Sequence, residues 1–236
     1  MIRMHSNTEI LEQAVSLLEE LTEQVVFVGG CSTGMLITDP AAPAVRVTLD
    51  VDVITNVDKL SDYYLLQEKL RDKGFKEDTG SDVICRYKNG TLILDVIPTD
   101  ATVLGFGNEW LKPAYRSAEP VQLPSGKRVK MISGPYFLAC KFSAFKGRGN
   151  GDYISPDIED IISVIDGRPE IIPEVRSADS KLKRYLINSF KEILKDRDFH
   201  DTLPGILPGD QASQARIPMV LSRLLTIAEL SVKQGS

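Results

Sequence analysis

The stretch VRVTLDVDVIT, residues 45–55, alternates apolar and polar side chains with the period of two that is typical of a β-strand. Its apolar side chains would share one face, which suits a core. The other face would carry Arg46, Thr48, Asp50 and Asp52. Residues on one face lie about 6.6–6.8 Å apart at Cα, so the two carboxylates repel each other unless a cation lies near them. The stretch predicts a core strand with a cation-binding face; the solvated face of a half-exposed sheet is the structural alternative.

A third carboxylate, Asp95, lies in the apolar stretch TLILDVIPTD, residues 91–100. A lone carboxylate in an apolar strand is costly unless it is paired or bound to a metal. If this strand neighbours residues 45–55, all three aspartates come together. Carboxylate oxygens are the ligands that Mg²⁺ prefers, so the three acids predict a magnesium site.

A pair of glycines follows the short apolar run QVVFV, residues 24–28, which predicts a buried strand. The next residues, up to Pro40, read as a short helix. Gly29 and Gly30 would let backbone N–H groups approach a phosphate, and a helix N-terminus favours an anion. Ser32 or Thr33 would add a hydroxyl. The segment lacks both the GxGxxG spacing of a dinucleotide-binding fold and the lysine of a Walker loop, and a simple tight turn is the alternative.

The remaining pattern predicts a chain in two parts. Helices are predicted over residues 8–21 and 59–74, the second with Tyr64, Leu65 and Leu70 as its core stripe. Residues 81–100 read as a hairpin turning at Asn89 and Gly90, residues 101–126 as irregular, and residues 121–131 as a small hairpin. Four helices follow, over residues 135–149, 156–166, 181–196 and 217–230. We expect an α/β (α+β) domain with a mixed or antiparallel sheet over residues 1–125, and a mainly helical domain over residues 126–236.

Composition excludes several classes of protein. Three widely spaced cysteines suggest neither a disulfide framework nor a zinc site, and two histidines argue against a histidine-dependent triad. Residues 1–100 carry 17 acidic and 9 basic side chains, whereas the rest of the chain carries 16 and 19. Between residues 121 and 151 there are six bases and no acid. We expect a cytoplasmic protein without a membrane span. The charge pattern suits metal on the acidic half and phosphate on the basic segment, and a solvated basic surface explains it equally well.

Together these motifs resemble the polymerase-beta-type nucleotidyltransferase superfamily. The matching residues are Gly29, Gly30, Asp50, Asp52 and Asp95. Within it, Arg46-x-Thr48-x-Asp50-Val51-Asp52 resembles the abortive-infection nucleotidyltransferases of type IV toxin–antitoxin systems. A second region, with Lys141 and Arg148 on one helix and Asp157 and Asp160 opening the next, is similar to that group. The resemblance covers roughly residues 25–165. It departs from the family at Gly30, where many members have serine, and in the long gap between Gly30 and Asp50.

The resemblance implies a nucleotidyltransferase that moves an NMP from an NTP, such as ATP, to a hydroxyl acceptor and releases pyrophosphate. Asp50 and Asp52 would hold two Mg²⁺ ions, with Mn²⁺ as a substitute, and Asp95 would complete the second metal site or act as general base. The resemblance also suggests a toxin-like enzyme with a cognate antitoxin. Its expected nucleotide-binding residues are Gly29, Gly30, Ser32, Thr33, Arg46, Lys141 and Arg148.

Several roles stay open at this point. Lys141 and Arg148 lie two helical turns apart and share a face, which suits phosphate, an RNA backbone or plain solvation. Asp157 and Asp160 would bind those bases instead of a metal, as an ion pair between helices. Arg46 either contacts phosphate, orients an aspartate or neutralises the pair.

Two other functions compete with the enzyme, a non-catalytic nucleotide- or partner-binding protein of a toxin–antitoxin pair and a Rossmann-like cofactor binder. The acceptor is RNA, a protein hydroxyl or an aminoglycoside-like molecule, and the basic segment favours RNA.

Overall fold

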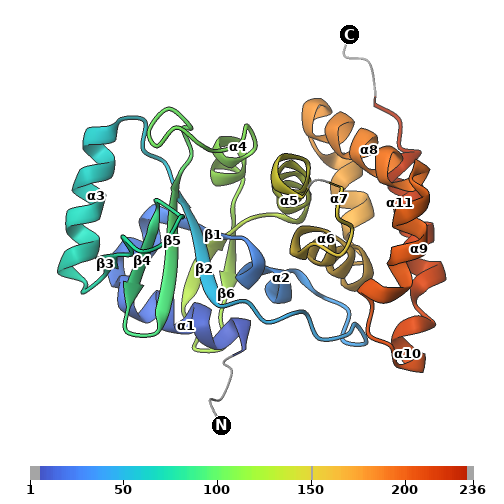
Figure 1. The fold of residues 1–236 in the computed structure, drawn as a ribbon, viewed down its shortest axis with the longest axis horizontal. Helices are drawn as coiled ribbons and strands as arrows, with labels where there is room; N and C mark the ends of the chain where they lie inside the picture. Colours follow the sequence, from blue (N-terminus) through green and yellow to red (C-terminus); the bar gives the residue numbers. More distant parts are fainter. Residues whose placement is uncertain (1–5, 150, 233–236) are drawn as a thin grey trace. The chain divides into compact units, whose positions relative to one another are not determined.

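Strands of the N-terminal half form a mixed sheet in the computed structural model, which describes residues 6–149 and 151–232. The order across the sheet is β3-β4-β5-β2-β1-β7-β6 (Figure 1). The predicted fold class, a mixed sheet followed by helices, is confirmed. The strands are β1 (Val25–Val28), β2 (Asp50–Thr55), β3 (Lys76–Glu77), β4 (Arg86–Asn89), β5 (Leu92–Pro98), β6 (Glu119–Gln122) and β7 (Arg128–Met131).

The central strand, β2, is shorter than predicted. It pairs with β1 in antiparallel and with β5 in parallel orientation, and both pairings lie within residues 50–55. The predicted start at residue 45 is wrong: Val47 is 40% and Leu49 73% exposed. A strand continues only where a neighbour supplies hydrogen bonds, and β1 ends at Val28, the residue that pairs with Asp52.

The predicted hairpin over residues 81–100 is present as β4 and β5, with a shifted turn. Asn89 pairs with Leu92, so Gly90 and Thr91 form the turn, and Gly90 has a φ of 59°. The expected turn at Asn89 and Gly90 is therefore one residue early. The small hairpin around Ser125 and Gly126 is confirmed as β6 and β7. The segment predicted to be irregular also contains helix α4 (Leu111–Arg116).

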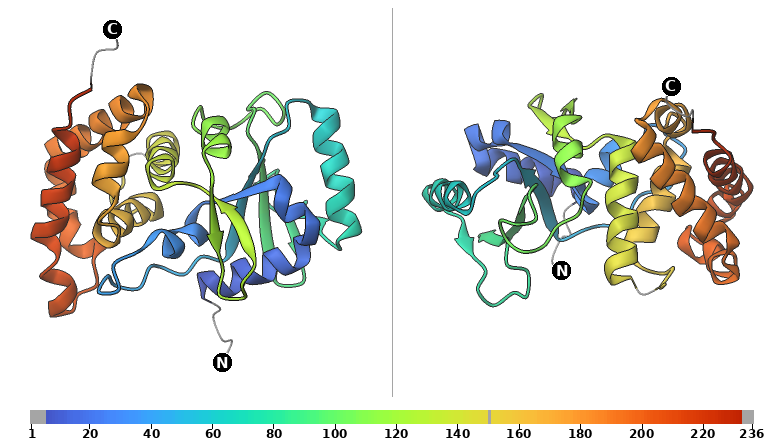
Figure 2. Two further views of the ribbon diagram at one scale, coloured as in Figure 1. Left: turned by 180° about the vertical axis from the view of Figure 1, so that it is seen from behind. Right: turned by 90° about the horizontal axis from the view of Figure 1, so that it is seen from above.

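Helices and one 3₁₀ helix accompany the sheet. Helix α1 begins with a capping box between Ser6 and Glu9, and it contacts β2 and β5. Helix α3 lies beside the β3–β4–β5 end of the sheet in each view (Figures 1 and 2), where Tyr63 donates to the Val96 carbonyl. Its buried stripe is Tyr63, Leu66 and Leu70. The predicted stripe is thus wrong at Tyr64 and Leu65, which are 55% and 57% exposed. The bounds are α1 (Asn7–Leu18), η1 (Glu19–Gln24), α2 (Gly30–Leu36) and α3 (Leu60–Asp72).

The C-terminal half is helical, as predicted. Ser155 and Pro156 stand at the N-cap and first position of α6, as the sequence pattern indicates. Helix α8 packs beside α11 (Figure 2) and also contacts α5. None of the helices in residues 6–149 and 151–232 has the length and hydropathy needed to span a membrane. The helices are α5 (Gly134–Arg148), α6 (Pro156–Gly167), α7 (Ile171–Ser177), α8 (Ser180–Lys195), α9 (Arg197–Ile206), α10 (Gln211–Gln214) and α11 (Ile217–Ala228).

The chain divides into two compact units that are not continuous in sequence. The sheet unit comprises the residues up to Gly34 and Val47–Ser133; the helical unit comprises Met35–Arg46 and the residues from Gly134 onward. The predicted domain boundary near residue 125 falls in the turn between β6 and β7. In the helical unit, the Gly167 carbonyl accepts hydrogen bonds from the N–H groups of Thr38 and Asp39, both at 2.9 Å. The segment 35–46 is thereby attached to the end of α6.

Candidate carboxylate site and the ion-pair network of the helical unit

The tight turn after β1 brings the backbone close to Asp52. Gly29 has a φ of +70°, and a Cβ atom built on it would lie 1.9 Å from Oδ2 of Asp52. Only glycine fits both this backbone conformation and this close approach. The turn and the polar face of β2 are therefore packed directly against each other.

The three predicted aspartates lie on adjacent strands. In the parallel β2–β5 pairing, Asp52 is the direct partner of Asp95, and Asp50 lies two residues earlier on the same face as Asp52. The Asp95 side chain is 7% and the Asp50 side chain 30% exposed. The carboxylates thus form one group at the centre of the sheet, which we call the carboxylate group.

Arg86 lies within this group and was not predicted to. On β4 it is the direct partner of Asp95. Its Nε donates to Oδ1 of Asp95 at 2.8 Å, and its Nη2 donates to Oδ2 of Asp95 at 2.7 Å and to Oδ2 of Asp50 at 2.8 Å. The hydrogen bonds to Asp95 are the largest cause that raises the pKa of Arg86. Its charge offsets part of the repulsion between the carboxylates.

The sequence does contain a signal for Arg86. In an antiparallel hairpin, residues directly opposite each other share a face, and Arg86 has the same parity as Asp95 about either turn position. Counting back from the predicted turn would have placed this arginine on the same face as the third aspartate, opposite residue 93.

Side-chain hydroxyl groups and the amide of Asn7 form hydrogen bonds on the buried side of the site. Thr48 donates its hydroxyl to Oδ1 of Asp50 at 2.7 Å, and its N–H donates to Oδ1 of Asn7 at 2.9 Å. Ser32 donates to the Val28 carbonyl at 2.9 Å, and the hydroxyl of Thr33 is fully buried. The nucleotide-binding roles of Ser32 and Thr33 stay predictions, since both hydroxyls point into the protein.

Asn7 was missed by the sequence analysis, and its role is positional. It is buried, and besides accepting from Thr48 its Nδ2 donates to the Gly30 carbonyl at 3.4 Å. It thus links the glycine turn to the residues that enter β2. A polar residue in the first turn of a surface helix gives no sequence signal for such a link.

Two cysteines lie near the carboxylates without adding to their charge. The pKa of Cys31 and of Cys85 is raised to about 12, mainly by burial, with the charge of Asp52 contributing for Cys31 and the charge of Asp95 for Cys85. Both thiols therefore stay protonated at neutral pH. The aspartates are the anionic side chains of this site.

By donor chemistry, the three aspartates fit a hard divalent cation such as Mg²⁺. Their arrangement is less simple, because Arg86 already contacts Asp50 and Asp95. In the part of the chain that the structure describes, no three carboxylate, cysteine or histidine side chains are grouped around a common metal position. The site thus contains carboxylates of the type that Mg²⁺ prefers, and the Arg86 guanidinium is bonded to two of them.

The other predicted basic residues lie in the helical unit, in a network with Asp157 and Asp160. Arg46 makes a bidentate pair with Asp160, through Nε at 3.1 Å and Nη2 at 2.8 Å. Burial acts to lower the pKa of Arg46, but the hydrogen bonds and charge of Asp160 outweigh it and the pKa is raised. Of the roles considered for Arg46, orienting an aspartate is the one that this geometry matches, and that aspartate is Asp160.

Lys141 and Arg148 share a face of α5, as their spacing predicts, and both reach Asp157. Lys141 Nζ lies 2.6 Å from Asp160 and 3.3 Å from Asp157, and Arg148 Nη2 lies 3.2 Å from Asp157. The Lys141 side chain is 10% exposed and the Arg148 side chain 75%. Lys141 is therefore part of a buried ion-pair network between α5 and α6, and Arg148 is the basic residue of this network that faces solvent.

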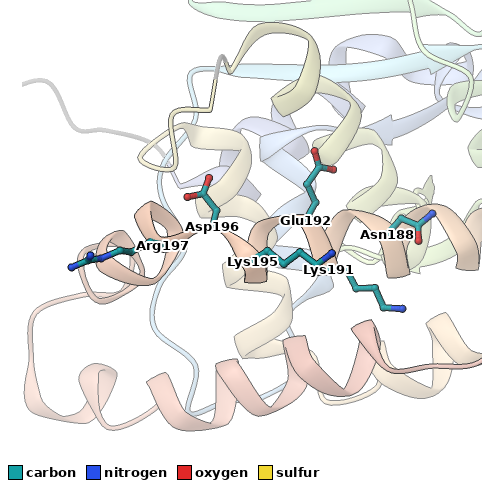
Figure 3. A pocket seen from close by; sticks show the side chains of 6 residues that line it. All are labelled: Asn188, Lys191, Glu192, Lys195, Asp196 and Arg197. Carbon is teal, nitrogen blue, oxygen red and sulfur yellow. The ribbon is translucent and has the colours of Figure 1, made fainter.

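A basic stripe runs along the exposed face of α8. The exposed residues follow a three- and four-residue spacing, and the opposite face is buried. The C-terminal end of the stripe borders a surface hollow that Figure 3 shows, lined by Asn188, Lys191, Glu192, Lys195, Asp196 and Arg197. Of the two acids that line the hollow, Glu192 pairs with Lys146 of α5 at 2.7 Å, and Asp196 accepts a hydrogen bond from the Tyr153 hydroxyl at 2.8 Å. We define the α8 basic face as Lys181, Arg184, Asn188, Lys191 and Lys195.

The sequence matches no model of a protein family and no curated protein. Three solved structures are similar to it in fold. A nucleotidyltransferase-like antigenic protein from Paracoccidioides brasiliensis matches with 20% identity over 84% of this chain and 92% of that chain, at a TM-score of 0.49. The antibiotic-resistance factor ANT(2'')-Ia matches with 14% identity over 66% and 81%, at 0.43. JHP933 from Helicobacter pylori matches with 10% identity over 95% and 89%, at 0.44. At such identities and TM-scores, these likenesses say nothing about the chemistry of this chain's own residues.

Proposed function

We propose that the protein is a magnesium-dependent nucleotidyltransferase, which moves an NMP from an NTP to a hydroxyl acceptor. The observation that carries this proposal is the pairing of Asp52 with Asp95 on adjacent strands, directly against the Gly29 turn. A turn that admits a phosphate, next to carboxylates that hold a hard cation, is the combination that phosphoryl chemistry on a nucleotide needs.

In the proposed reaction, the acceptor hydroxyl oxygen forms a bond to the α-phosphorus. The bond from that phosphorus to the oxygen bridging it to the β-phosphate breaks, and pyrophosphate leaves. The hydroxyl proton passes to a carboxylate, for which Asp95 is the candidate. Asp50 and Asp52 would hold Mg²⁺, which neutralises phosphate charge and activates the hydroxyl.

The remaining site residues are assigned to the phosphates. The backbone of Gly29 and Gly30 would lie against the triphosphate, with the buried Ser32 and Thr33 supporting the turn. In the helical unit, the exposure of Arg148 supports it as a phosphate contact, and Arg46 and Lys141 would hold Asp157 and Asp160 in place.

For the acceptor we propose RNA. The α8 basic face carries four positive charges over about 21 Å of helix, a spacing that suits several phosphates of a nucleic-acid backbone. A toxin-like role with a cognate antitoxin rests on the Arg46-to-Asp52 motif and on the looser second region from Lys141 to Asp160, and it belongs to the same proposal.

The test is incubation with each α-labelled NTP, Mg²⁺ and total RNA. We expect label transfer by the wild type and by Asp62→Asn, an exposed control on the same unit, but at least a hundredfold slower transfer by Asp52→Asn. Equal transfer by Asp52→Asn and the wild type would rule the proposed site out. Magnesium-dependent NTP binding without any transfer would favour the non-catalytic alternative, which the hold of Arg86 on two carboxylates supports.

A further inference from the structure

We infer that Arg86 is a built-in counter-cation of the carboxylate group, and that a divalent cation binds Asp50 and Asp95 in competition with it. This inference rests on the proposed function, because it concerns the metal that the proposed reaction needs. It assigns to Arg86 a positioning role: the arginine acts through the carboxylates on the metal.

The contacts of the carboxylate oxygens carry the first step. Both oxygens of Asp95 accept hydrogen bonds from Arg86, at 2.8 and 2.7 Å. Of the two oxygens of Asp50, one accepts from Arg86 at 2.8 Å and the other from Thr48 at 2.7 Å. A metal ion that takes oxygens of both aspartates would therefore share oxygens with Arg86 and weaken its hydrogen bonds.

Charge carries the second step. A guanidinium keeps its positive charge at any physiological pH, so Arg86 cannot make room for a metal by losing a proton. Two cations at the same pair of carboxylates repel each other, more strongly at a site of low exposure, and the Asp95 side chain is 7% exposed. The metal and the guanidinium therefore compete for the carboxylates, and binding of one weakens the hold of the other.

The covalent framework allows the Arg86 guanidinium to move away from a carboxylate. Arg86 is the first residue of β4, and its side chain is 20% exposed. The long side chain can turn toward solvent while its backbone stays paired with Asp95. Arg86 would thus stabilise the sheet in the metal-free protein and release the carboxylates in the metal-bound protein.

This role predicts two effects of opposite sign. Replacing Arg86 by Gln removes the competing cation, so the metal binds more tightly. The same change leaves Asp50 and Asp95 without their counter-charge, so the metal-free protein is less stable. An arginine with a merely structural role would give the loss of stability without tighter metal binding.

The experiment is an isothermal calorimetric titration of the whole chain with Mn²⁺ alone, which gives the Kd for Mn²⁺. We expect the Kd of Arg86→Gln to be at least tenfold lower than that of the wild type. Arg86→Lys should lie between them, since its single ammonium cannot hold both carboxylates by a fork. Arg71→Gln, which removes an exposed arginine paired with Glu77, is the matched control and should bind like the wild type.

A measurement on the wild type keeps the inference testable if Arg86→Gln does not fold. In protein labelled with ¹⁵N-arginine, the Nε–H signal of Arg86, assigned with Arg86→Lys, should shift as Mg²⁺ is added, and its exchange with water should accelerate. An unchanged signal at saturating Mg²⁺ overturns the inference, as does an equal or higher Kd for Arg86→Gln, or no Mn²⁺ binding by either protein.

The outcomes separate this inference from the proposed function. Label transfer to RNA by the wild type, together with an unchanged Kd for Mn²⁺ in Arg86→Gln, would contradict the competition and support the proposed nucleotidyltransferase activity. Tighter Mn²⁺ binding by Arg86→Gln, together with no label transfer by the wild type, would support the competition and contradict the proposed nucleotidyltransferase activity.

Discussion

A Cβ atom on Gly29 would collide with the Asp52 carboxylate, at 1.9 Å from Oδ2, so the site tolerates no side chain there. At this scale a single hydrogen atom in place of a methyl group decides where a carboxylate lies. The φ of +70° adds a second demand, because side chains strain such a backbone.

Gly29→Ala should displace Asp52 and reduce label transfer at least a hundredfold. Gly126→Ala is the matched control: its φ is +83°, but a Cβ there meets nothing within 4 Å. Urea denaturation should show a loss of about 1 kcal/mol for Gly126→Ala from backbone strain alone, and a larger loss for Gly29→Ala because the collision with Asp52 is added. Full transfer activity in Gly29→Ala would contradict the assigned contact with Asp52.

Lys141 and Arg148 share a partner, Asp157, yet they should respond very differently to replacement. Lys141→Met leaves two buried carboxylates short of a counter-charge and should lower the free energy of unfolding by about 3–5 kcal/mol. Arg148→Met, with the side chain 75% exposed, should cost less than about 1 kcal/mol. Urea denaturation of both variants measures the difference, and equal losses would show that the network is not held by Lys141.

At the scale of elements, the alternation in residues 45–55 predicts the face of β2 correctly and its length wrongly. Asp50 and Asp52 do share a face, because side-chain parity is a local property of the chain. The start of the strand depends on β1, which ends at Val28, and no pattern within residues 45–49 reveals that. Tyr64 and Leu65 fail for a similar reason, because the face of α3 that is buried depends on where the sheet lies.

The α8 basic face should bind RNA through its phosphates. Lys191→Glu combined with Lys195→Glu should weaken RNA binding at least tenfold and lower the slope of log K against log salt by about 1.4, the value for two contacts to a single strand. Lys59→Glu combined with Lys76→Glu makes the same charge change at exposed positions of the sheet unit and should change binding little. Fluorescence anisotropy measures the affinity for RNA at salt concentrations from about 50 to 200 mM, the range over which phosphate contacts weaken. Equal losses of RNA affinity in both double variants would show that RNA binding depends on the net charge of the protein and not on the α8 basic face.

At the scale of the whole molecule, the segment 35–46 belongs to the helical unit although it lies between two parts of the sheet unit. Arg216 of the helical unit holds it: Nη2 donates to Asp39 at 2.6 Å, and Nε donates to Asp166 at 2.7 Å. The Asp166 side chain is 4% exposed, so Arg216 is the counter-charge of a buried carboxylate.

Arg216→Gln should therefore loosen residues 38–42 together with the end of α6. An uncompensated buried carboxylate costs about 3–5 kcal/mol, so amide hydrogen exchange there should accelerate by about two orders of magnitude or more. Peptides from β1, β2 and β5 should exchange as in the wild type, and Arg176→Gln, an exposed arginine of α7, should leave both regions unchanged. Faster exchange throughout the sheet would show that the two units do not respond separately.

Much of the fold follows from local patterns, and the rest depends on pairing. Helical spacing after Pro135, the cap at Ser155 and the glycine turn are all readable because their causes lie within a few residues. The division of the chain into units is not, since the hydrogen bonds of Thr38 and Asp39 go to Gly167, far along the sequence. In the site, the residue types of the carboxylate group were predicted and the hairpin parity of Arg86 was readable but not used, whereas Asn7 emerges only from its side-chain hydrogen bonds to Thr48 and Gly30.

The position of β2 between two partners has a consequence for how this chain can change over time. Its register is set twice, by β1 on one side and by β5 on the other. Inserting or deleting one residue between Asp50 and Asp52 would put the two carboxylates on opposite faces, and a change elsewhere in residues 50–55 would flip the residues on one side of it relative to β1 and β5. A library of single-residue insertions and deletions should therefore lose activity at these six positions and keep it around the turn at Gly126. Substitution can tune this site gradually, whereas a change of length in β2 removes it in one step.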